Sequence, residues 1–284
     1  MKLKVIKYTS RNGIGEQIIF AIKCLSQLKK NELIHFEFNN FFYTNSFKTN
    51  IWDKFFFQPF EEYKHEIHKK IIEKDYQLIQ SPEINKLIAK PIISYTHKKS
   101  IKKLCDRKYI EPTRKIFKKF IRFKPIITKK TDYFFTKNIK RKKTISVHIR
   151  GTDKFLVHAK GQEKLFNYEK FIKPKIIKQM KKKKTKKIFL ATDEQEKYSK
   201  MNIDFKKNLL KYKTSNLSNE AIHWASLFES EKIKNKICEE ALIDTVLMSM
   251  TDYSFFCQSN LSLVALLLRN DYEYSFIDDH INYR

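Results

Sequence analysis

Apolar and polar positions along this chain of 284 residues follow two different periods in turn. Residues 3–8 have the pattern of a strand, and a turn at residues 10–13 follows them. Apolar side chains then recur at helical spacing from Ile14 to Leu28. A strand, a turn that contains glycine and a helix are typical of the opening of an α/β unit.

The same alternation is sharper in the second half of the chain. The pattern predicts strands at 144–149, 188–191, 253–257 and 274–277, and helices at 168–182, 194–201, 237–250 and 259–268. Strands that alternate with helices of this length form parallel βαβ units. We therefore expect an α/β fold with parallel sheets.

The segment at residues 39–130 is rich in aromatic and charged side chains and has a less regular pattern. Helices are expected near residues 61–74 and 112–123, whereas strands cannot be placed there. The basic stretch at residues 137–143 separates this half from the next one. We assign residues 1–140 to an N-terminal domain and residues 141–284 to a C-terminal domain.

The composition is strongly basic, with 59 Lys and Arg against 31 Asp and Glu and a net charge of +28. Over-used Lys, Ile, Asn and Phe indicate that A/T-rich codons account for part of this charge. A field of this sign still favours anionic partners such as nucleic acid, an anionic membrane face or a phosphorylated substrate. The densest basic run spans residues 178–187.

Several features bear on the compartment. The longest apolar stretch, residues 261–268, is far shorter than the ~20 residues of a membrane span. The four cysteines have no metal-ligand spacing and lie in apolar runs, which favours reduced, buried thiols. We expect a cytoplasmic protein that contacts the inner face of the cytoplasmic membrane peripherally at most.

Candidate chemistry gathers where three predicted strands end, because ligands of open α/β sheets bind beyond the carboxyl ends of strands. Arg150 offers a planar fork for phosphate oxygens. Ser259 and Asn260 begin a helix, whose free N–H groups suit an anion. Asp193 can accept hydrogen bonds from the amide and amine of guanine. Together they indicate a nucleoside diphosphate site, although Arg150 could instead pair with Asp153.

Other known sites are excluded by their missing motifs. The chain has no GxxxxGK[ST] phosphate loop and no GxGxxG after a strand, which argues against P-loop kinases and dinucleotide-binding dehydrogenases. It also lacks GxSxG, HExxH and an Asp-x-Asp metal site.

The motif from His148 to Lys154, His-Ile-Arg-Gly-Thr-Asp-Lys, resembles the His-x-Arg-x-x-Asp-Lys motif of the nodulation-type and core α1,6-fucosyltransferases. Residues 189–193, Phe-Leu-Ala-Thr-Asp, resemble the second motif of that family, and residues 240–260 resemble its third, in the same order. The turn at residues 12–17 is similar to the glycine-rich turn of α1,2- and α1,6-fucosyltransferases. The resemblance covers residues 144–270 well and the first 25 residues weakly.

This resemblance implies a GT-B architecture, in which two Rossmann-like domains face a central cleft and the N-terminal one lies on the acceptor side. It implies a GDP-fucose donor, inversion at the anomeric carbon and no metal or other cofactor. The residues that it places at the donor are His148, Arg150, Asp153, Lys154, Asp193, Ser259, Asn260, Gly13 and Gly15. Arg150 would hold the diphosphate, Asp193 would bind guanine, and Asp153 would brace its loop.

Neither Glu163 nor His158 aligns cleanly with the family's catalytic acidic residue, so both are candidates for the general base. We prefer Glu163. Gly151 also stands where the family commonly has a second arginine. Only four glycines occur, against about 20 for average usage, and Gly13, Gly15, Gly151 and Gly161 all lie in predicted site loops. We expect them to mark the cleft.

We therefore expect an inverting, metal-independent fucosyltransferase that acts on a glycan, such as a bacterial surface polysaccharide or glycolipid. One alternative keeps the fold and uses another nucleotide sugar. A less favoured alternative is a basic nucleic-acid-binding protein. Most Phe and Tyr residues fall in core-like patterns and no RNP, KH or zinc motif occurs, so we expect no nucleic-acid partner.

Overall fold

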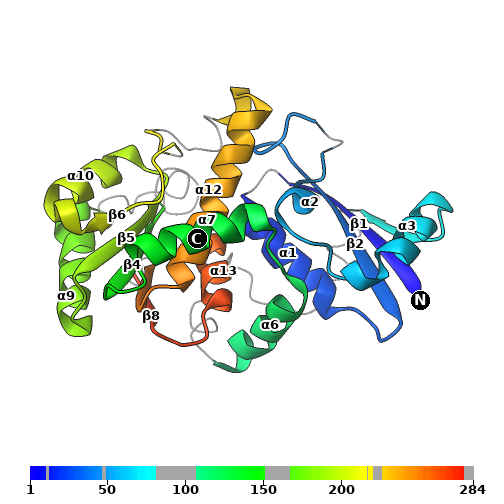
Figure 1. Cartoon of the computed structure of the whole chain (residues 1–284), viewed down its shortest axis with the longest axis horizontal. Helices are drawn as coiled ribbons and strands as arrows, with labels where there is room; N and C mark the ends of the chain where they lie inside the picture. The colour runs from blue at the N-terminus through cyan, green and yellow to red at the C-terminus, as the bar shows by residue number, and fades with distance from the viewer. Residues whose placement is uncertain are drawn as a thin grey trace.

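The computed structural model describes residues 1–10, 13–46, 49–80, 107–150, 167–215, 217–219 and 226–277. These residues form two parallel β-sheets with helices packed around and between them, so the predicted α/β class is confirmed. In Figure 1 the first sheet lies on the right and the second on the left, with α1, α12 and α13 between them.

The first sheet has the order β2-β1-β3, with all strands parallel. The central strand β1 (Lys2–Ser10) pairs along its whole length with β2 (Glu32–Asn40). The third strand is β3 (Gln77–Gln80). β1 was predicted, whereas β2 and β3 were not.

Helices of the first half begin with α1 (Ile14–Ser26), as predicted. The others are α2 (Ile51–Phe55), η1 (Glu61–Tyr63), α3 (Lys64–Ile72), α6 (Arg107–Phe120) and α7 (Pro125–Asn138). η1 with α3 matches the helix predicted at 61–74, and α6 begins before the predicted residue 112. The aromatic residues of the first half fill a core around Trp52, whose ring lies 4.8 Å from Phe36 and 4.5 Å from Phe56.

The second sheet has the order β6-β5-β4-β7-β8, again with all strands parallel. Its strands are β4 (Thr144–Ile149), β5 (Lys187–Thr192), β6 (Leu209–Leu210), β7 (Tyr253–Phe256) and β8 (Tyr274–Phe276). The chain winds outward from β4 in one direction and then returns to β7 on its other side. The strand order therefore reverses between β4 and β7, where doubly wound sheets bind ligands.

Helices of the second half agree with the predicted alternation. They are η3 (Tyr168–Ile172), α9 (Lys173–Lys183), α10 (Gln195–Phe205), η4 (Lys206–Asn208), η5 (Ser226–Phe228), α12 (Glu231–Ser249) and α13 (Asn260–Leu268). α12 starts six residues before the predicted helix because Ser230 caps it, with its Oγ accepting from Ile233 N at 3.4 Å.

The two sheets share one hydrophobic core. The largest buried cluster runs without a break from α1 and β2 to β5, α12 and α13. α6 packs against α1 and α13, and α7 packs against α12, although both helices precede residue 140. The division into domains at residues 1–140 and 141–284 therefore stays a prediction. No helix in the described ranges is long and apolar enough to span a bilayer.

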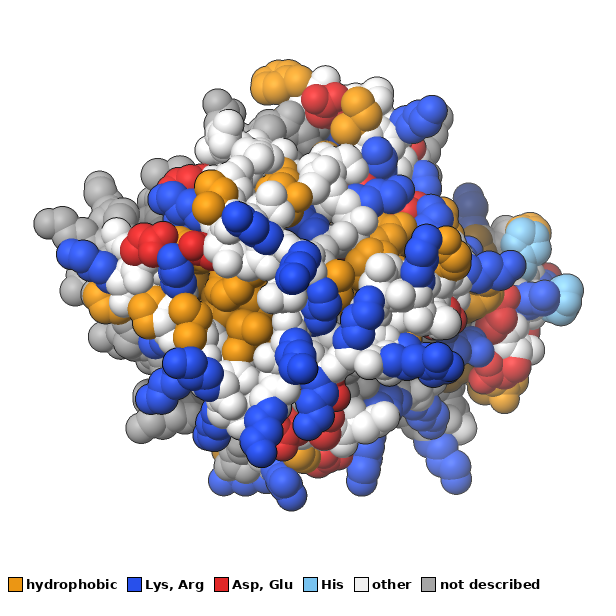
Figure 2. All heavy atoms as spheres, turned by 60° about the vertical axis from the view of Figure 1, so that its left-hand side comes forward, with side chains coloured by type: hydrophobic (Ala, Val, Ile, Leu, Met, Phe, Trp, Pro, Cys, Tyr) orange, Lys and Arg blue, Asp and Glu red, His pale blue; other side chains and the backbone are white. Residues whose placement is uncertain are grey.

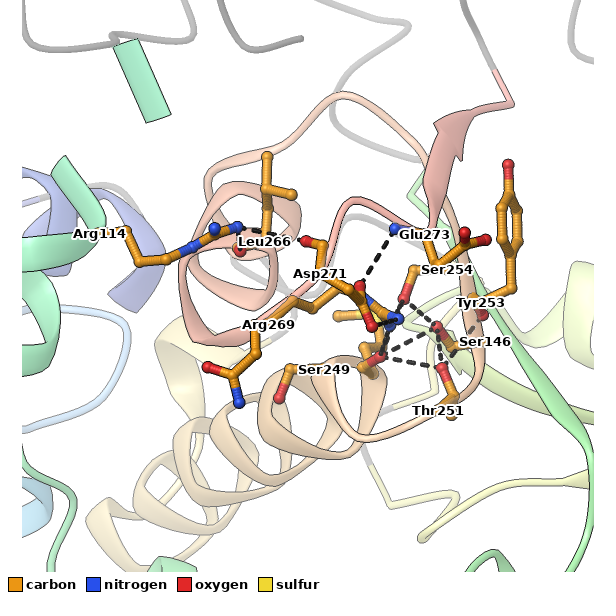
Figure 3. Close-up of polar contacts among 12 residues, drawn as sticks. Arg114, Ser146, Ser249, Thr251, Tyr253, Ser254, Leu266, Arg269, Asp271 and Glu273 are labelled. Atoms are coloured by element: carbon orange, nitrogen blue, oxygen red, sulfur yellow. Dashed lines mark hydrogen bonds and ion pairs between the residues drawn. The ribbon is translucent and has the colours of Figure 1, made fainter. Parts of the chain in front are cut away.

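A buried arginine fixes the C-terminal end of α13. The guanidinium of Arg269, at 1% side-chain exposure, pairs with Asp271 at 2.7 Å and donates to Ser254 Oγ at 2.7 Å (Figure 3). Arg114 of α6 reaches the same region and donates to the carbonyl oxygen of Leu266 at 3.2 Å. The network ties α13 to β7 on one side and to α6 on the other.

Replacing Arg269 by methionine should lower the free energy of unfolding by about 1–3 kcal/mol, because the buried Ser254 hydroxyl and Met248 carbonyl oxygen lose a charged donor. Burial raises the pKa of Asp271, but hydrogen bonding and charge from Arg269 outweigh it and hold the pKa below its usual range. The contribution of the Asp271–Arg269 pair to the free energy of unfolding is therefore fully present above about pH 4, near the pKa of aspartate in the unfolded chain. It is lost as the pH falls through the lower pKa of Asp271 in the folded protein.

Urea unfolding at several pH values measures this effect. The difference between wild type and Arg269→Met should shrink in acid, whereas the exposed Arg141→Met should change little at any pH. A difference that stays constant with pH would exclude the ion pair as its source.

Candidate functional site

Three strand ends lie side by side at the carboxyl edge of the second sheet. Ile149 of β4 is opposite Thr192 of β5, so the next residues, Arg150 and Asp193, emerge together. On the other side of β4, Cys257 N donates to the carbonyl oxygen of His148 at 3.0 Å. The structure thus brings Arg150, Asp193 and the start of α13 to the point where the strand order reverses.

The start of α13 has the form of an anion site. Ser259 has extended backbone, and its Oγ accepts from Ser262 N at 3.0 Å, which makes it the N-cap. The amides of Asn260 and Leu261 precede the first intrahelical hydrogen bond, so the helix itself does not satisfy them. The macrodipole adds a partial positive charge at this end. Ser259 is buried and Asn260 is half-buried.

His148 lies directly behind this turn and is 5% exposed. Its Nδ1 is 2.6 Å from Ser262 Oγ, which donates its own proton to the carbonyl oxygen of Cys257 at 2.6 Å. Because a hydroxyl has one proton, Nδ1 is the donor to Ser262 whenever that hydroxyl donates to Cys257. His148 therefore braces the cap of α13, and a contact between His148 and the donor stays a prediction.

The turn that carries Asp193 is held from the opposite side by the segment after β6. Ser218 N donates to the carbonyl oxygen of Asp193 at 2.8 Å. The ammonium of Lys211, at 4% side-chain exposure, donates to the carbonyl oxygen of Thr192 at 3.1 Å and lies 3.5 Å from Asp244 Oδ2. A buried charge of this kind needs such a partner, and here it fixes the backbone beside Asp193.

The N-terminal end of α1 meets the N-terminal end of α13. A Cβ atom on Gly15 would lie 2.9 Å from Leu261 N and 3.0 Å from the carbonyl carbon of Asn260. Only glycine allows the two backbones to approach this closely. Gly15 thus lies against the backbone of α13, and its predicted place at the donor stays a prediction. Gly13 is the N-cap residue of α1.

Tyr43, on the loop after β2, completes the junction. Its Oη accepts from Ile14 N at 3.2 Å, and its ring is buried. Burial raises the pKa of this phenol, the charge of Asp193 adds to the shift, and the charge of Arg150 opposes it. Tyr43 from the first half therefore lies within electrostatic reach of both candidate donor-binding residues.

The remaining predicted site residues lie outside the described residues. They are Gly151, Asp153, Lys154, His158, Gly161 and Glu163. The choice between Glu163 and His158 as base thus stays open. In the described ranges no group of three His, Cys, Asp or Glu residues is placed to hold a metal ion.

Comparison with known proteins gives structural relatives only. No protein-family model matches the sequence, and no curated protein matches it. The fucosyltransferase NodZ from Bradyrhizobium is 13% identical and has a TM-score of 0.57, with 95% of this chain and 94% of that chain covered. POFUT1 in complex with GDP-fucose is 11% identical with a TM-score of 0.52, and 97% of each chain is covered.

The chain has a fucosyltransferase-like GT-B fold. The match spans both sheets and confirms at the level of fold the resemblance that the three motifs indicate.

Sequence patterns missed two residues of this candidate site. Tyr43 lies in an aromatic run, where a buried tyrosine that caps a helix has the same pattern as a core residue. Lys211 lies among many lysines, and its burial depends on Asp244, 33 residues away in the chain. Neither position carries a local signal.

Replacing Gly15 by alanine should destabilise the protein by about 1–3 kcal/mol, because the new methyl group overlaps the backbone of α13. Inside an ordinary helix the same substitution has the opposite effect, because alanine stabilises a helix by up to about 1 kcal/mol relative to glycine. Urea unfolding measures the change.

The matched control is Gly13→Ser. Its backbone angles, φ −67° and ψ 161°, suit serine as an N-cap, so stability should be unchanged or slightly higher. An alanine at position 15 that leaves stability unchanged would refute the close contact.

Proposed function

We propose that this protein transfers fucose from GDP-fucose to a hydroxyl group of a glycan. The observation that carries the proposal is the meeting of Arg150, Asp193 and the N-terminal end of α13 where the strand order reverses. NodZ soaked with GDP-fucose and POFUT1 in complex with GDP-fucose have the same fold, which supports this choice of donor.

Each group at this edge suits one part of a guanosine diphosphate. The carboxylate of Asp193 is a pure acceptor and fits the two neighbouring N–H donors on the guanine edge. The fork of Arg150 and the first amides of α13 are donors suited to the diphosphate. A site built on hydrogen bonds to the base rejects a base that lacks them.

The reaction would begin with attack by the acceptor oxygen on the anomeric carbon of fucose. The new glycosidic bond forms as the bond from that carbon to the diphosphate oxygen breaks, with inversion, and GDP leaves with the bonding electrons. A base takes the hydroxyl proton, for which we propose Glu163 first and His158 second. Arg150, Lys154 and the α13 amides would stabilise the charge that develops on the diphosphate.

The acceptor side of the cleft would be formed by the first half, including residues 39–130. We propose a bacterial surface polysaccharide or glycolipid as acceptor and a cytoplasmic location. A transferase that uses another nucleotide sugar is the second candidate, because the phosphate-binding groups alone do not select the base.

A donor screen tests the proposal. Purified protein is incubated with GDP-fucose, GDP-mannose, UDP-glucose or ADP-glucose, and release of the free nucleotide is measured with a mixture of glycan acceptors. Turnover with GDP-fucose above all others is expected. Turnover only with a UDP- or ADP-sugar would overturn the assignment of Asp193.

Replacing Arg150 by alanine should lower the turnover rate by about 10²-fold or more, because one preorganised charged donor to the leaving group is lost. Thermal unfolding should be nearly unchanged, since Arg150 is half-buried at the edge of the sheet. The exposed Arg122→Ala is the control. Near-wild-type turnover in Arg150→Ala would sink the proposed role.

Prolonged treatment with EDTA should leave turnover intact, because the proposed mechanism stabilises the leaving diphosphate with protein donors alone. The rate is measured before chelation, after it and after addition of Mn²⁺. Complete loss that Mn²⁺ restores would require a metal-dependent mechanism instead.

A further inference from the structure

Basic side chains gather at the edge of the second sheet opposite the candidate site. Thr144 pairs with Lys187, and Ile188 pairs with Leu209, so the amino-terminal ends of β4, β5 and β6 are neighbours. Ten exposed cations at these ends make up what we call the basic edge. They are Lys140, Arg141, Lys142, Lys143, Lys181, Lys182, Lys184, Lys186, Lys206 and Lys207.

Composition alone does not explain this density. Ten of the eleven residues at 140–143 and 181–187 are Lys or Arg, against 59 of 284 in the whole chain. The C-terminal ends of α7, α9 and α10 also lie close to these segments in the chain. Cations are favourable at helix C-termini, so the helices account for some of the lysines. Three macrodipoles amount to roughly −1.5 charges, however, far less than the cations present.

The basic edge is not neutralised within the described part of the chain. Its ten residues form no ion pair there. The nearby Lys183 pairs with Glu273, and Lys187 Nζ donates to the carbonyl oxygen of Lys207. The acidic residue Asp252 belongs to the β7 side, where its Oδ2 accepts from Thr144 N at 2.8 Å. Mutual repulsion among these cations would be relieved by an anionic partner.

Exposed aliphatic side chains stand one turn from the lysines. Ile177 of α9 is 36% exposed and precedes Lys181 on the same helical stripe. Ile203 of α10 is 69% exposed and shortly precedes Lys206. Figure 2 shows the face that carries α9 and α10, where Lys and Arg side chains far outnumber acidic ones around apolar atoms.

We infer that the basic edge docks on an anionic lipid surface. Lysine clusters are attracted to such surfaces, and apolar side chains beside them can enter the interface. Binders of single-stranded nucleic acid stack bases on aromatic rings. The strongly exposed aromatic residues in the described ranges lie on other elements, namely η1, α6, α7 and η5. These observations favour lipid over nucleic acid.

This contact goes beyond the proposed transfer reaction and is separable from it. The basic edge lies at the amino-terminal ends of strands whose carboxyl ends carry Arg150 and Asp193. Docking through it leaves the candidate site open to the aqueous side. Vesicle binding therefore tests the contact whether or not the protein transfers fucose.

The test measures co-sedimentation of the full chain with vesicles of phosphatidylcholine containing about 30% phosphatidylserine, at about 0.15 M salt. An edge variant carries four changes, Lys181→Gln, Lys182→Gln, Lys184→Gln and Lys186→Gln. Each cation near such a surface contributes about fivefold to binding, so affinity should fall on the order of 10²-fold or more. Vesicles of phosphatidylcholine alone should bind neither protein.

A control variant removes the same charge from exposed lysines on other elements, through Lys30→Gln, Lys64→Gln, Lys115→Gln and Lys129→Gln. It should retain most of the wild-type affinity, and thermal unfolding should show both variants folded. If the edge variant is unfolded, replacing residues 140–143 by glutamine provides a second test. Equal losses in both variants, no binding by wild type, or tighter binding to single-stranded oligonucleotide than to vesicles would overturn the proposal.

Discussion

The contact between the N-terminal ends of α1 and α13 is the constraint on which the site depends. Gly15 lets the α1 backbone lie against the Asn260–Leu261 peptide, and this joins the first sheet to the carboxyl edge of the second. The other end of α13 is fixed by Arg269 and Arg114. A helix held at both ends presents its first amides at a defined position beside Arg150, which preorganised binding of a diphosphate requires.

The strands and helices of the second half could be predicted because each is marked by a pattern within its own sequence. β4 is buried along its whole length, so its apolar run and the polar residues after it identify a central parallel strand and its loop. β2 was missed although its burial alternates, because it lies at the border of the irregular segment. β6, with two residues, is too short for any period to show. α7 packs against α12, which lies about 100 residues later in the chain, so its burial depends on a contact that no local pattern shows.

Some residues of the candidate site could likewise be predicted from local sequence, and others could not. Arg150, Asp193 and Ser259 follow predicted strands and could be found from strand ends alone. Tyr43 and Lys211 support them through contacts made only in the fold, with Ile14 and with Asp244. The location of the charge also depends on the fold, because a net charge of +28 in the composition indicates only that the partner is anionic. The register of β4, β5 and β6 gathers the basic edge on one side of the sheet and leaves the candidate donor-binding groups on the other.

Calorimetric titration tests whether Asp193 and Arg150 form a guanosine diphosphate site, as we propose. GDP is titrated into wild type and into Asp193→Asn, and UDP into wild type. We expect GDP to bind wild type with a Kd of about 1 μM, and we expect both UDP binding to wild type and GDP binding to Asp193→Asn to be on the order of 10²-fold weaker. Equal affinity for GDP and UDP, or unchanged GDP binding by Asp193→Asn, would contradict it.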